Sequence, residues 1–189
     1  MCSVPTVERM SADEFLALAS REDGRRRQLI DGELVMNEPS WSHSDSQLTI
    51  LTALRIWSQA AEARGAVNMP VDVKIDERNV YGPDVVWYRE GRSPRRGDIA
   101  PYPLPDLAVE VRSPSTWRHD IGTKKRNYER RGVGELWLVD TAADVVLVFR
   151  RSSPQTPTFD VSEELDASAT LTTPLLPGFA LPVAAIFGG

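Results

Sequence analysis

With 189 residues, 41% of them hydrophobic, the chain is long enough to bury a sizeable core, and its length predicts one domain over residues 1–189. Its net charge of −5 argues against a protein that coats nucleic acid through bulk electrostatics. The single cysteine, Cys2, excludes a disulfide framework and a cysteine-based zinc site. The sequence shows no secretory leader and no apolar run of membrane-spanning length, so we expect a cytoplasmic protein with no membrane partner.

The N-terminal third predicts a short helix, a hairpin and a long helix. Ser11 and Glu14 form a capping box before an apolar run, so a helix begins there. Asp31-Gly32 suits a two-residue hairpin turn between strands at 28–30 and 33–36. Apolar residues then recur at helical spacing from about 42 to 64, and Gly65 ends this helix.

The middle of the chain predicts the central sheet. Extended segments at about 66–75, 83–88 and 107–111 are separated by loops rich in Gly, Pro, Asp and Arg. A helix to about residue 131 follows and closes at Gly132, and strands at 135–140 and 144–149 come next. The proline-rich remainder predicts short strands that extend the sheet and cover one face. This order of elements is typical of a mixed α/β sandwich.

Two acids stand inside these apolar strands. Asp84 begins the second extended segment and Glu110 lies near the end of the third, so antiparallel pairing would bring their carboxylates side by side. Buried carboxylates are costly unless they are paired, hydrogen-bonded or bound to a cation, and Mg²⁺ commonly uses one or two of them. The alternative is structural, with Asp84 in a turn and Glu110 paired with Arg112 or a nearby lysine, and the spacing alone leaves it open.

A longer set of motifs surrounds these acids. They are Gln28-Leu-Ile-Asp-Gly-Glu-Leu-Val35, His43, Gly82-Pro-Asp84, Pro105-Asp-Leu-Ala-Val-Glu-Val-Arg-Ser-Pro-Ser115, Asp120-Ile-Gly-Thr-Lys124 with Tyr128, Gly132-Val-Gly-Glu-Leu-Trp137 and Leu175-Leu-Pro-Gly-Phe179. In this order they resemble the Uma-two family of restriction-endonuclease-like proteins, within the PD-(D/E)XK nuclease superfamily. The resemblance covers nearly the whole chain, and the part from Glu110 to Trp137 is its most specific part.

The resemblance implies an α/β fold with a restriction-endonuclease-like mixed central sheet, flanked by helices and followed by a β-rich C-terminal extension. It also implies a deoxyribonuclease that depends on Mg²⁺ or Mn²⁺. Asp84 and Glu110 would bind the metal together with the backbone carbonyl of Val111. A metal-activated water would then hydrolyse a DNA phosphodiester bond by in-line attack.

The superfamily's usual lysine, two residues after the glutamate, is replaced by Arg112. Arginine keeps its proton, so it can hold a phosphate but is a poor general base. The resemblance assigns the amine to Lys124, which precedes Tyr128 by one helical turn and shares its face. An ion pair with Asp120 on a wet helix surface is the alternative for Lys124, and spacing alone leaves it open. The predicted substrate-binding residues are Arg112, Arg118, Lys125 and Tyr128.

Several other residues invite functional readings that the sequence does not favour. Gln28 stands where family members more often carry glutamate, which would weaken the metal site unless Glu33 compensates. His43 and His119 are too few for a histidine-based zinc site. Ser113 and Ser115 lack a nucleophile-elbow signature, and Ser-Pro-Ser is typical of a helix-capping turn. Asp84 and Glu110 could be imagined as a glycosidase pair, but the sequence shows no aromatic sugar platform that would favour this.

The leading hypothesis is therefore a metal-dependent nuclease acting on DNA, with Asp84, Glu110 and Lys124 as its catalytic residues. The competing hypothesis is a catalytically degenerate nuclease fold that binds nucleic acid or a protein partner, which Gln28 and Arg112 favour. A purely structural subunit would bind neither metal nor DNA. Exposed strand edges in the C-terminal third also favour a homodimer.

Overall fold

The fold was analysed in a computed structural model, which describes residues 9–18 and 26–188. Its helices are α1 (Ala12–Ala17), α2 (Trp41–Gln59), α3 (Trp117–His119), the π-helix η1 (Asp120–Lys124), α4 (Lys125–Arg131) and α5 (Val183–Ile186). Its strands are β1 (Arg26–Ile30), β2 (Glu33–Asn37), β3 (Ala66–Asn68), β4 (Val73–Asp76), β5 (Asn79–Tyr81), β6 (Val85–Tyr88), β7 (Leu107–Val111), β8 (Glu135–Asp140), β9 (Val145–Arg150), β10 (Val161–Leu165), β11 (Thr170–Leu171) and β12 (Leu181–Pro182).

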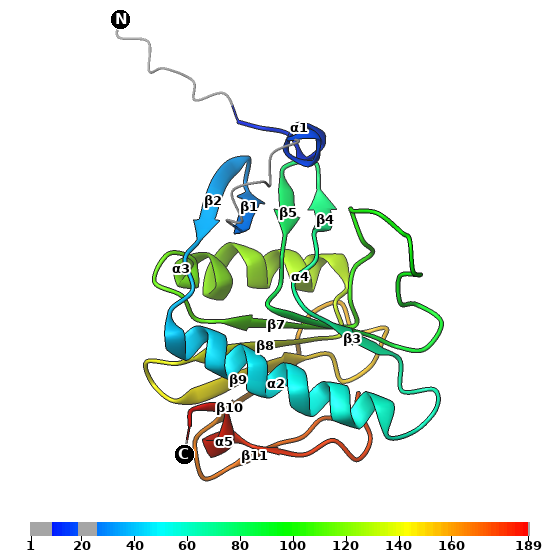
Figure 1. Ribbon diagram of the computed structural model, residues 1–189, viewed down its shortest axis with the longest axis vertical. Coiled ribbons are helices and arrows are strands. Elements are labelled where there is room, and N and C mark those ends of the chain that lie inside the picture. Colours follow the sequence, from blue (N-terminus) through cyan, green and yellow to red (C-terminus); the bar gives the residue numbers. More distant parts are fainter. Residues whose placement is uncertain (1–8, 19–25, 189) are drawn as a thin grey trace, which may run out of the picture.

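A six-stranded mixed sheet forms the centre of the molecule. Its strand order is β10-β9-β8-β7-β6-β3, and the β7–β8 pair is parallel while its other pairs are antiparallel. A second sheet, β2-β1-β5-β4, stands on the side of α4, while α2 covers the opposite face of the six-stranded sheet (Figure 1). The β11–β12 ribbon and α5 close the α2 side. The expected mixed sheet with flanking helices and a β-rich C-terminal extension is thus confirmed.

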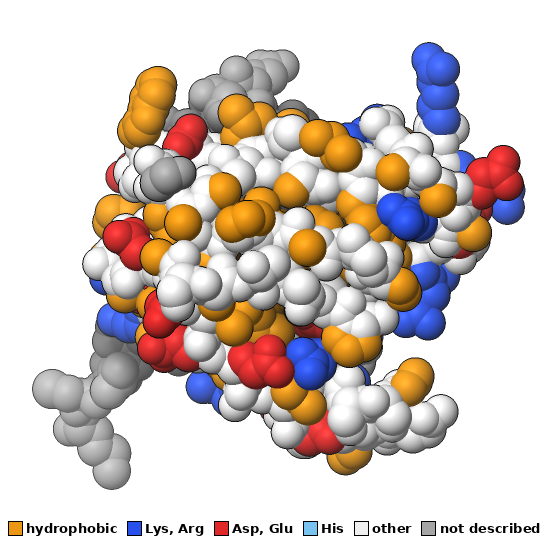
Figure 2. All heavy atoms as spheres, turned by 90° about the horizontal axis from the view of Figure 1, so that it is seen from below, with side chains coloured by type: hydrophobic (Ala, Val, Ile, Leu, Met, Phe, Trp, Pro, Cys, Tyr) orange, Lys and Arg blue, Asp and Glu red, His pale blue; other side chains and the backbone are white. Residues whose placement is uncertain are grey.

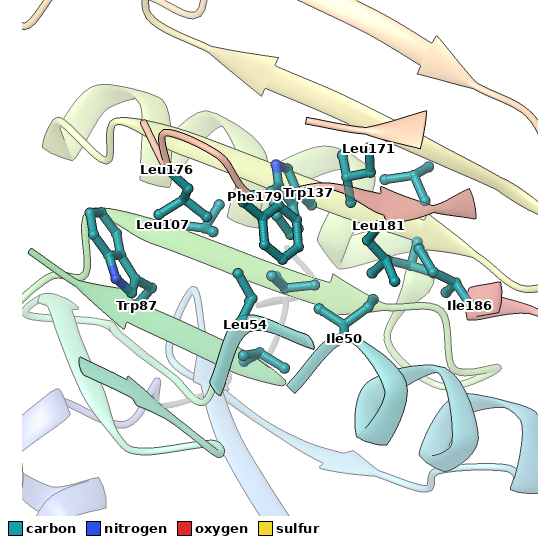
Figure 3. Close-up of a cluster of buried hydrophobic side chains, with 14 of the residues drawn as sticks. Ile50, Leu54, Trp87, Leu107, Trp137, Leu171, Leu176, Phe179, Leu181 and Ile186 are labelled. Carbon is teal, nitrogen blue, oxygen red and sulfur yellow. The ribbon is translucent and has the colours of Figure 1, made fainter. Parts of the chain in front are cut away.

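Successive side chains of a strand point to opposite faces of the sheet, so the apolar residues fall into two layers. Leu107, Val109 and Val111 of β7 face α2, where they join Trp137, Phe179 and residues of the C-terminal segment (Figure 3). The intervening Ala108 faces the other way, into a second cluster that contains Tyr128 of α4. Glu110 shares this second face by the period-two rule for strands. The acid therefore points to α4 rather than to α2.

The surface on the lower side of Figure 1 carries little clustered charge. Figure 2 shows hydrophobic side chains spread among uncharged ones over the middle of this face, with Lys, Arg, Asp and Glu mostly towards its margins. No helix in the described ranges combines the length and the apolarity that a membrane crossing requires.

Local signals at the N-terminus are confirmed. The Ser11 hydroxyl accepts from the Glu14 amide, and the Glu14 carboxylate accepts from the Ser11 amide, which completes the capping box of α1. The hairpin pairs Ile30 with Glu33, and its turn takes φ of 50° at Asp31 and 80° at Gly32. Gly132, with φ of 87°, ends α4 as expected. These features depend on neighbouring residues, which is why the sequence predicts them.

Two predicted boundaries are wrong. The segment 66–75 is not one strand: β3 joins the six-stranded sheet, whereas β4 pairs with β5 in the second sheet, and Pro70 lies between them without an N–H to donate. Helix α2 ends at Gln59, well before Gly65. In its last turn the Trp57 carbonyl accepts from the Ala60 N–H at 3.3 Å and from Arg64 Nη1 at 2.9 Å.

Candidate metal and nuclease site

The predicted antiparallel pairing of the two acidic segments is confirmed. Val85 of β6 lies opposite Val109 of β7, and the next step in this register brings Asp84 opposite Glu110. Directly opposed residues of an antiparallel pair project from the same face with their Cβ atoms only about 5 Å apart. Both acids are buried, with 3% of Asp84 and 2% of Glu110 exposed.

Asp84 is held by the end of β7 and by the start of α2. Its Oδ2 accepts from the backbone N–H of Val111 at 2.7 Å and lies 3.2 Å from His43 Nε2. Its carbonyl accepts from Gln47 Nε2 at 2.7 Å. Because α2 and β7 both fix Asp84, its carboxylate is oriented before any ligand arrives.

Glu110 is held from the other side by α4 and η1. Its Oε1 accepts from the Tyr128 hydroxyl at 2.6 Å and forms an ion pair with Lys124 Nζ at 2.6 Å. Burial raises the pKa of Glu110 to about 8, Lys124 opposes this shift, and the carboxylates of Asp120 and Asp84 add to it. Burial is the largest cause of this pKa shift, and the two neighbouring carboxylates are smaller ones.

Lys124 is entirely buried, with 0% of its side chain exposed. Its Nζ lies 2.9 Å from Asp120 Oδ1 and 5.5 Å from the centre of the Tyr81 ring. Burial lowers the pKa of Lys124, but Asp120 and Glu110 outweigh burial and keep the ammonium charged. The Asp120 ion pair of the alternative interpretation exists, yet its placement on a wet surface is wrong, because the lysine points into the site.

A π-helical turn brings Lys124 to this position. Within η1 the backbone widens, and the N–H of Lys125 donates to the carbonyl of Asp120, five residues earlier. Thr116 Oγ1 donates to Asp120 Oδ2 at 2.9 Å, which fixes the acid at the start of the turn. Single π-turns are frequent at functional sites because they redirect one side chain without ending the helix.

The donor set fits a hard divalent cation. Among the described residues, the polar partners of Glu110 contact Oε1 and those of Asp84 contact Oδ2, so Oε2 and Oδ1 have no protein partner. Within residues 9–18 and 26–188, no cluster of three or more His, Cys, Asp or Glu forms a cation site by itself. A two-carboxylate site still suits Mg²⁺, which fills its remaining positions with water and substrate oxygens.

The predicted phosphate-contacting residues are not gathered around the two acids. Arg112 Nη1 contacts Asp140 at 2.8 and 3.0 Å, and its guanidinium lies 5.4 Å from the Trp117 ring centre. The ammonium of Lys125 lies 4.4 Å from the Phe149 ring centre, over β9. Arg118 is exposed and lines a hollow beside η1. Tyr128 alone of the four contacts Glu110 directly.

Gln28 has a structural partner of its own. Its Oε1 accepts from the Gly82 amide at 3.2 Å, so it anchors the loop that delivers Asp84. Glu33 does not replace the missing glutamate, since its side chain is 62% exposed at the hairpin end, 4.0 Å from Arg9.

Sequence reasoning assigned no site role to Asp120 and treated His43 as a landmark only. Asp120 precedes Lys124 by four residues, and this spacing was its one sequence signal. His43 is 2% exposed, and its closeness to Asp84 depends on how α2 packs against the sheet, which no local motif reveals.

Comparisons with known proteins agree with this architecture. A family model described as "Uma2: Putative restriction endonuclease" matches residues 12–184. A solved structure, described as a "putative nuclease belonging to DUF820" from Anabaena variabilis, superposes with a TM-score of 0.77 at 22% sequence identity. The match covers 94% of this chain and 97% of that chain, and at this identity it shows the fold alone. No curated protein matches the chain.

Proposed function

The chain belongs to the Uma2 restriction-endonuclease family, and we propose that it is a nuclease that hydrolyses DNA phosphodiester bonds with the aid of Mg²⁺ or Mn²⁺. The family and the fold support a nuclease. One observation carries the finer proposal: Asp84 and Glu110 are buried opposite each other, and each carboxylate has one oxygen without a partner in the part of the chain that the structure describes.

In this proposal Asp84 Oδ1 and Glu110 Oε2 hold the cation, with the carbonyl of Val111 as a further oxygen ligand. A bound divalent cation would supply Lewis-acid activation of the phosphate and of the attacking water. The backbone N–H of Val111 keeps Asp84 in place through Oδ2, and Tyr128 does the same for Glu110 through Oε1. These contacts leave the metal-facing oxygens oriented before the cation binds.

Lys124 is assigned the role of the catalytic amine. Its ammonium stays charged between Glu110 and Asp120, so it acts as a cation and hydrogen-bond donor rather than as a base. Its charge offsets the repulsion between a phosphate and the acid cluster and stabilises the charge that develops on the phosphoryl oxygens. This role is compatible with an arginine at position 112.

Phosphate contacts away from the reacting bond are assigned to Arg118, Arg112 and Lys125. Arg118 is the exposed member of the three. To contact a phosphate, Arg112 would bind it while still paired with Asp140. Lys125 would move its ammonium away from the rings of Phe149 and Phe159. The acidic net charge of −5 is tolerable because affinity for DNA depends on local contacts.

A homodimer and a cytoplasmic location belong to the same proposal. Strand β10 is the edge of the six-stranded sheet, and the residues that the structure describes provide no strand beyond it. A second copy could pair there, because an uncovered edge offers free backbone donors and acceptors. Light scattering of the purified protein tests this part, and a monomeric mass at all concentrations would remove it.

Nicking of supercoiled plasmid DNA tests the proposal. Wild-type protein should nick with Mn²⁺ and stop when a chelator removes it, whereas Glu110→Gln and Asp84→Asn should both lose activity. Glu163→Gln is the matched control, because Glu163 is an acid on β10 that pairs with Arg150 at 3.4 Å, away from the site. Equal nicking by the wild type and Glu110→Gln would contradict the proposal. DNA binding without any Mn²⁺-dependent nicking would instead favour a binding module.

A further inference from the structure

A pocket of about 600 Å³ lies at the end of the central sheet where the parallel strands β7 and β8 begin. Its lining includes Asp106, which directly precedes β7, and Glu135, the first residue of β8. Glu110 lies near the other end of β7, roughly 13 Å from Asp106 at the usual rise of a strand. This pocket is therefore separate from the candidate metal site.

Four arginines from two segments line the pocket. Arg89 and Arg92 follow β6, whereas Arg150 ends β9 and Arg151 comes directly after it. The side chains of Arg89 and Arg92 are about half exposed, so their guanidinium groups can reach a ligand in the pocket. Like charges repel, so four cations that converge from two segments favour an anion between them.

The two acids in the lining do not cancel this charge. Asp106 is buried, and its Oδ1 accepts from both Arg89 Nε and Arg92 Nη1, so one oxygen serves two cations. Glu135 is buried as well, and its carboxylate accepts from an indole N–H and a threonine hydroxyl of the interior. The other lining residues are glycine, serine, proline, valine and leucine. The charge that a ligand meets in this pocket is therefore positive.

Arg151 contributes a fixed charge to the pocket. Its Nε donates to the Val133 carbonyl at 3.1 Å, and its Nη1 and Nη2 donate to the carbonyls of Thr156 and Glu129. In the described part of the chain these three carbonyls are its hydrogen-bond partners, and no carboxylate pairs with it. The guanidinium is therefore held in one orientation while its charge is not neutralised.

Arg89 and Arg150 keep donors for a ligand. Arg150 Nη2 lies 3.4 Å from Glu163 Oε1, an acid outside the pocket lining. Within residues 9–18 and 26–188, Nε and Nη1 of Arg150 and both Nη atoms of Arg89 make no hydrogen bond. These donors belong to side chains that are 21% and 50% exposed, so a ligand can meet them.

We propose that this pocket binds a phosphate group, carried by a nucleotide or by a DNA strand. The planar fork of arginine matches two oxygens of a phosphate, which offers three acceptor oxygens and up to two negative charges. A single carboxylate offers two oxygens and one charge, so it would leave more of the free donors unmet. The inference does not depend on nuclease activity, because the arginines contact neither Asp84 nor Glu110.

Calorimetric titration with inorganic pyrophosphate in a metal-free buffer tests the site. Wild-type protein should bind pyrophosphate, and acetate at the same concentration should not displace it. Pro154→Glu adds a carboxylate to the lining and Arg150→Gln removes a cation, so each should weaken binding by about tenfold or more. The matched controls are Pro157→Glu, at an exposed position of the same loop, and Arg78→Gln, at an exposed position between β4 and β5. Both controls should bind like the wild type.

Absence of pyrophosphate binding to the wild type would overturn the inference, as would binding that both pocket variants retain or that acetate displaces equally well. Circular dichroism establishes that each variant is folded. Pro154→Glu leaves all four arginines in place, so it decides the matter if Arg150→Gln unfolds.

A short DNA duplex, followed by fluorescence anisotropy in the same buffer, identifies the source of the phosphate. If a DNA strand supplies it, pyrophosphate should displace the duplex and Pro154→Glu should weaken duplex binding. If a nucleotide supplies it, neither should change duplex binding, and a nucleoside diphosphate should displace pyrophosphate. Pyrophosphate binding without any nicking removes the proposed function and leaves the pocket. Glu110-dependent nicking without pyrophosphate binding removes the pocket and leaves the function.

Discussion

Lys124 Nζ lies 2.6 Å from Glu110 Oε1, and both side chains are almost completely buried. Removing one partner of such a pair leaves an uncompensated charge in the interior, whereas replacing both can be nearly neutral. This relationship connects the helix after β7 to the acid pair on β6 and β7, so the stability of the fold and the charge of the site depend on the same contact.

Lys124→Met should destabilise the metal-free protein by about 3–5 kcal/mol, because Glu110 and Asp120 lose their shared cation. Urea unfolding followed by circular dichroism measures this loss. The double variant Lys124→Met with Glu110→Gln should recover much of it, since it removes charge from both partners. Lys125→Met is the control and should cost at most about 1 kcal/mol, the usual worth of an exposed cation–π contact. If Lys124→Met is as stable as the wild type, the proposed energetic role of the buried Lys124–Glu110 pair is wrong.

Stability should also depend on pH through Glu110. Burial raises its pKa from 4.5 to about 8, so the folded protein holds this proton more tightly than the unfolded chain does. Its contribution to stability is therefore complete below the unfolded value and is lost as the pH rises through about 8. Urea unfolding at a series of pH values in a chelator should show this decline in the wild type.

Glu110→Gln should show a weaker decline over the same pH range, because glutamine does not ionise. The difference between the two stability curves isolates the contribution of position 110 from that of the other titrating groups. Parallel curves would mean that Glu110 is ionised throughout the range and that its charge is already satisfied by Lys124.

A second buried acid offers a prediction that concerns folding alone. Glu135 accepts from Trp137 Nε1 at 2.6 Å and from Thr173 Oγ1 at 2.5 Å, and burial raises its pKa while these two bonds lower it. Thr173→Val keeps the shape but removes the donor to Glu135 and the acceptor of the Leu175 N–H, so it should cost about 1–3 kcal/mol in thermal or urea unfolding.

The matched control for Thr173→Val is Thr170→Val, an exposed position on β11 that should change stability little. Neither substitution should reduce nicking per folded molecule, because Glu135 lies at the start of β8 and makes no contact with Asp84 or Glu110. Loss of nicking in folded Thr173→Val would extend the site to the C-terminal segment, contrary to this account.

The features that the sequence predicts are those governed by neighbouring residues. The Ser11 capping box, the Asp31-Gly32 turn and the strands predicted at 135–140 and 144–149 all follow local rules, although the second strand runs from 145 to 150. The opposed positions of Asp84 and Glu110 follow from the predicted antiparallel pairing. The π-turn before Lys125 has no comparable signal in the sequence. The end of α2 at Gln59 also has no clear signal, because Gly65 stands six residues later.

In the candidate site, too, some features have a signal in the sequence and others depend on the fold. Lys124 was placed near the acids by family position, but its burial and its second partner, Asp120, required the fold. The sequence did not predict the partners of Arg112 and Lys125, because Asp140 and Phe149 lie on β8 and β9, far from them in the chain. The closeness of His43 to Asp84 depends on how α2 packs against the sheet, which has no sequence signature.

Calorimetric titration with Mn²⁺ tests the central claim most directly, because it asks whether Asp84 and Glu110 form one cation site. The account predicts that the wild type and Glu163→Gln bind Mn²⁺ alike. Asp84→Asn and Glu110→Gln should each weaken Mn²⁺ binding by more than about tenfold. Removing a residue that only hydrogen-bonds to a metal ligand usually costs about tenfold or more in metal affinity, and these two residues are ligands themselves. Absence of binding to the wild type, or unchanged affinity in both variants, would contradict it.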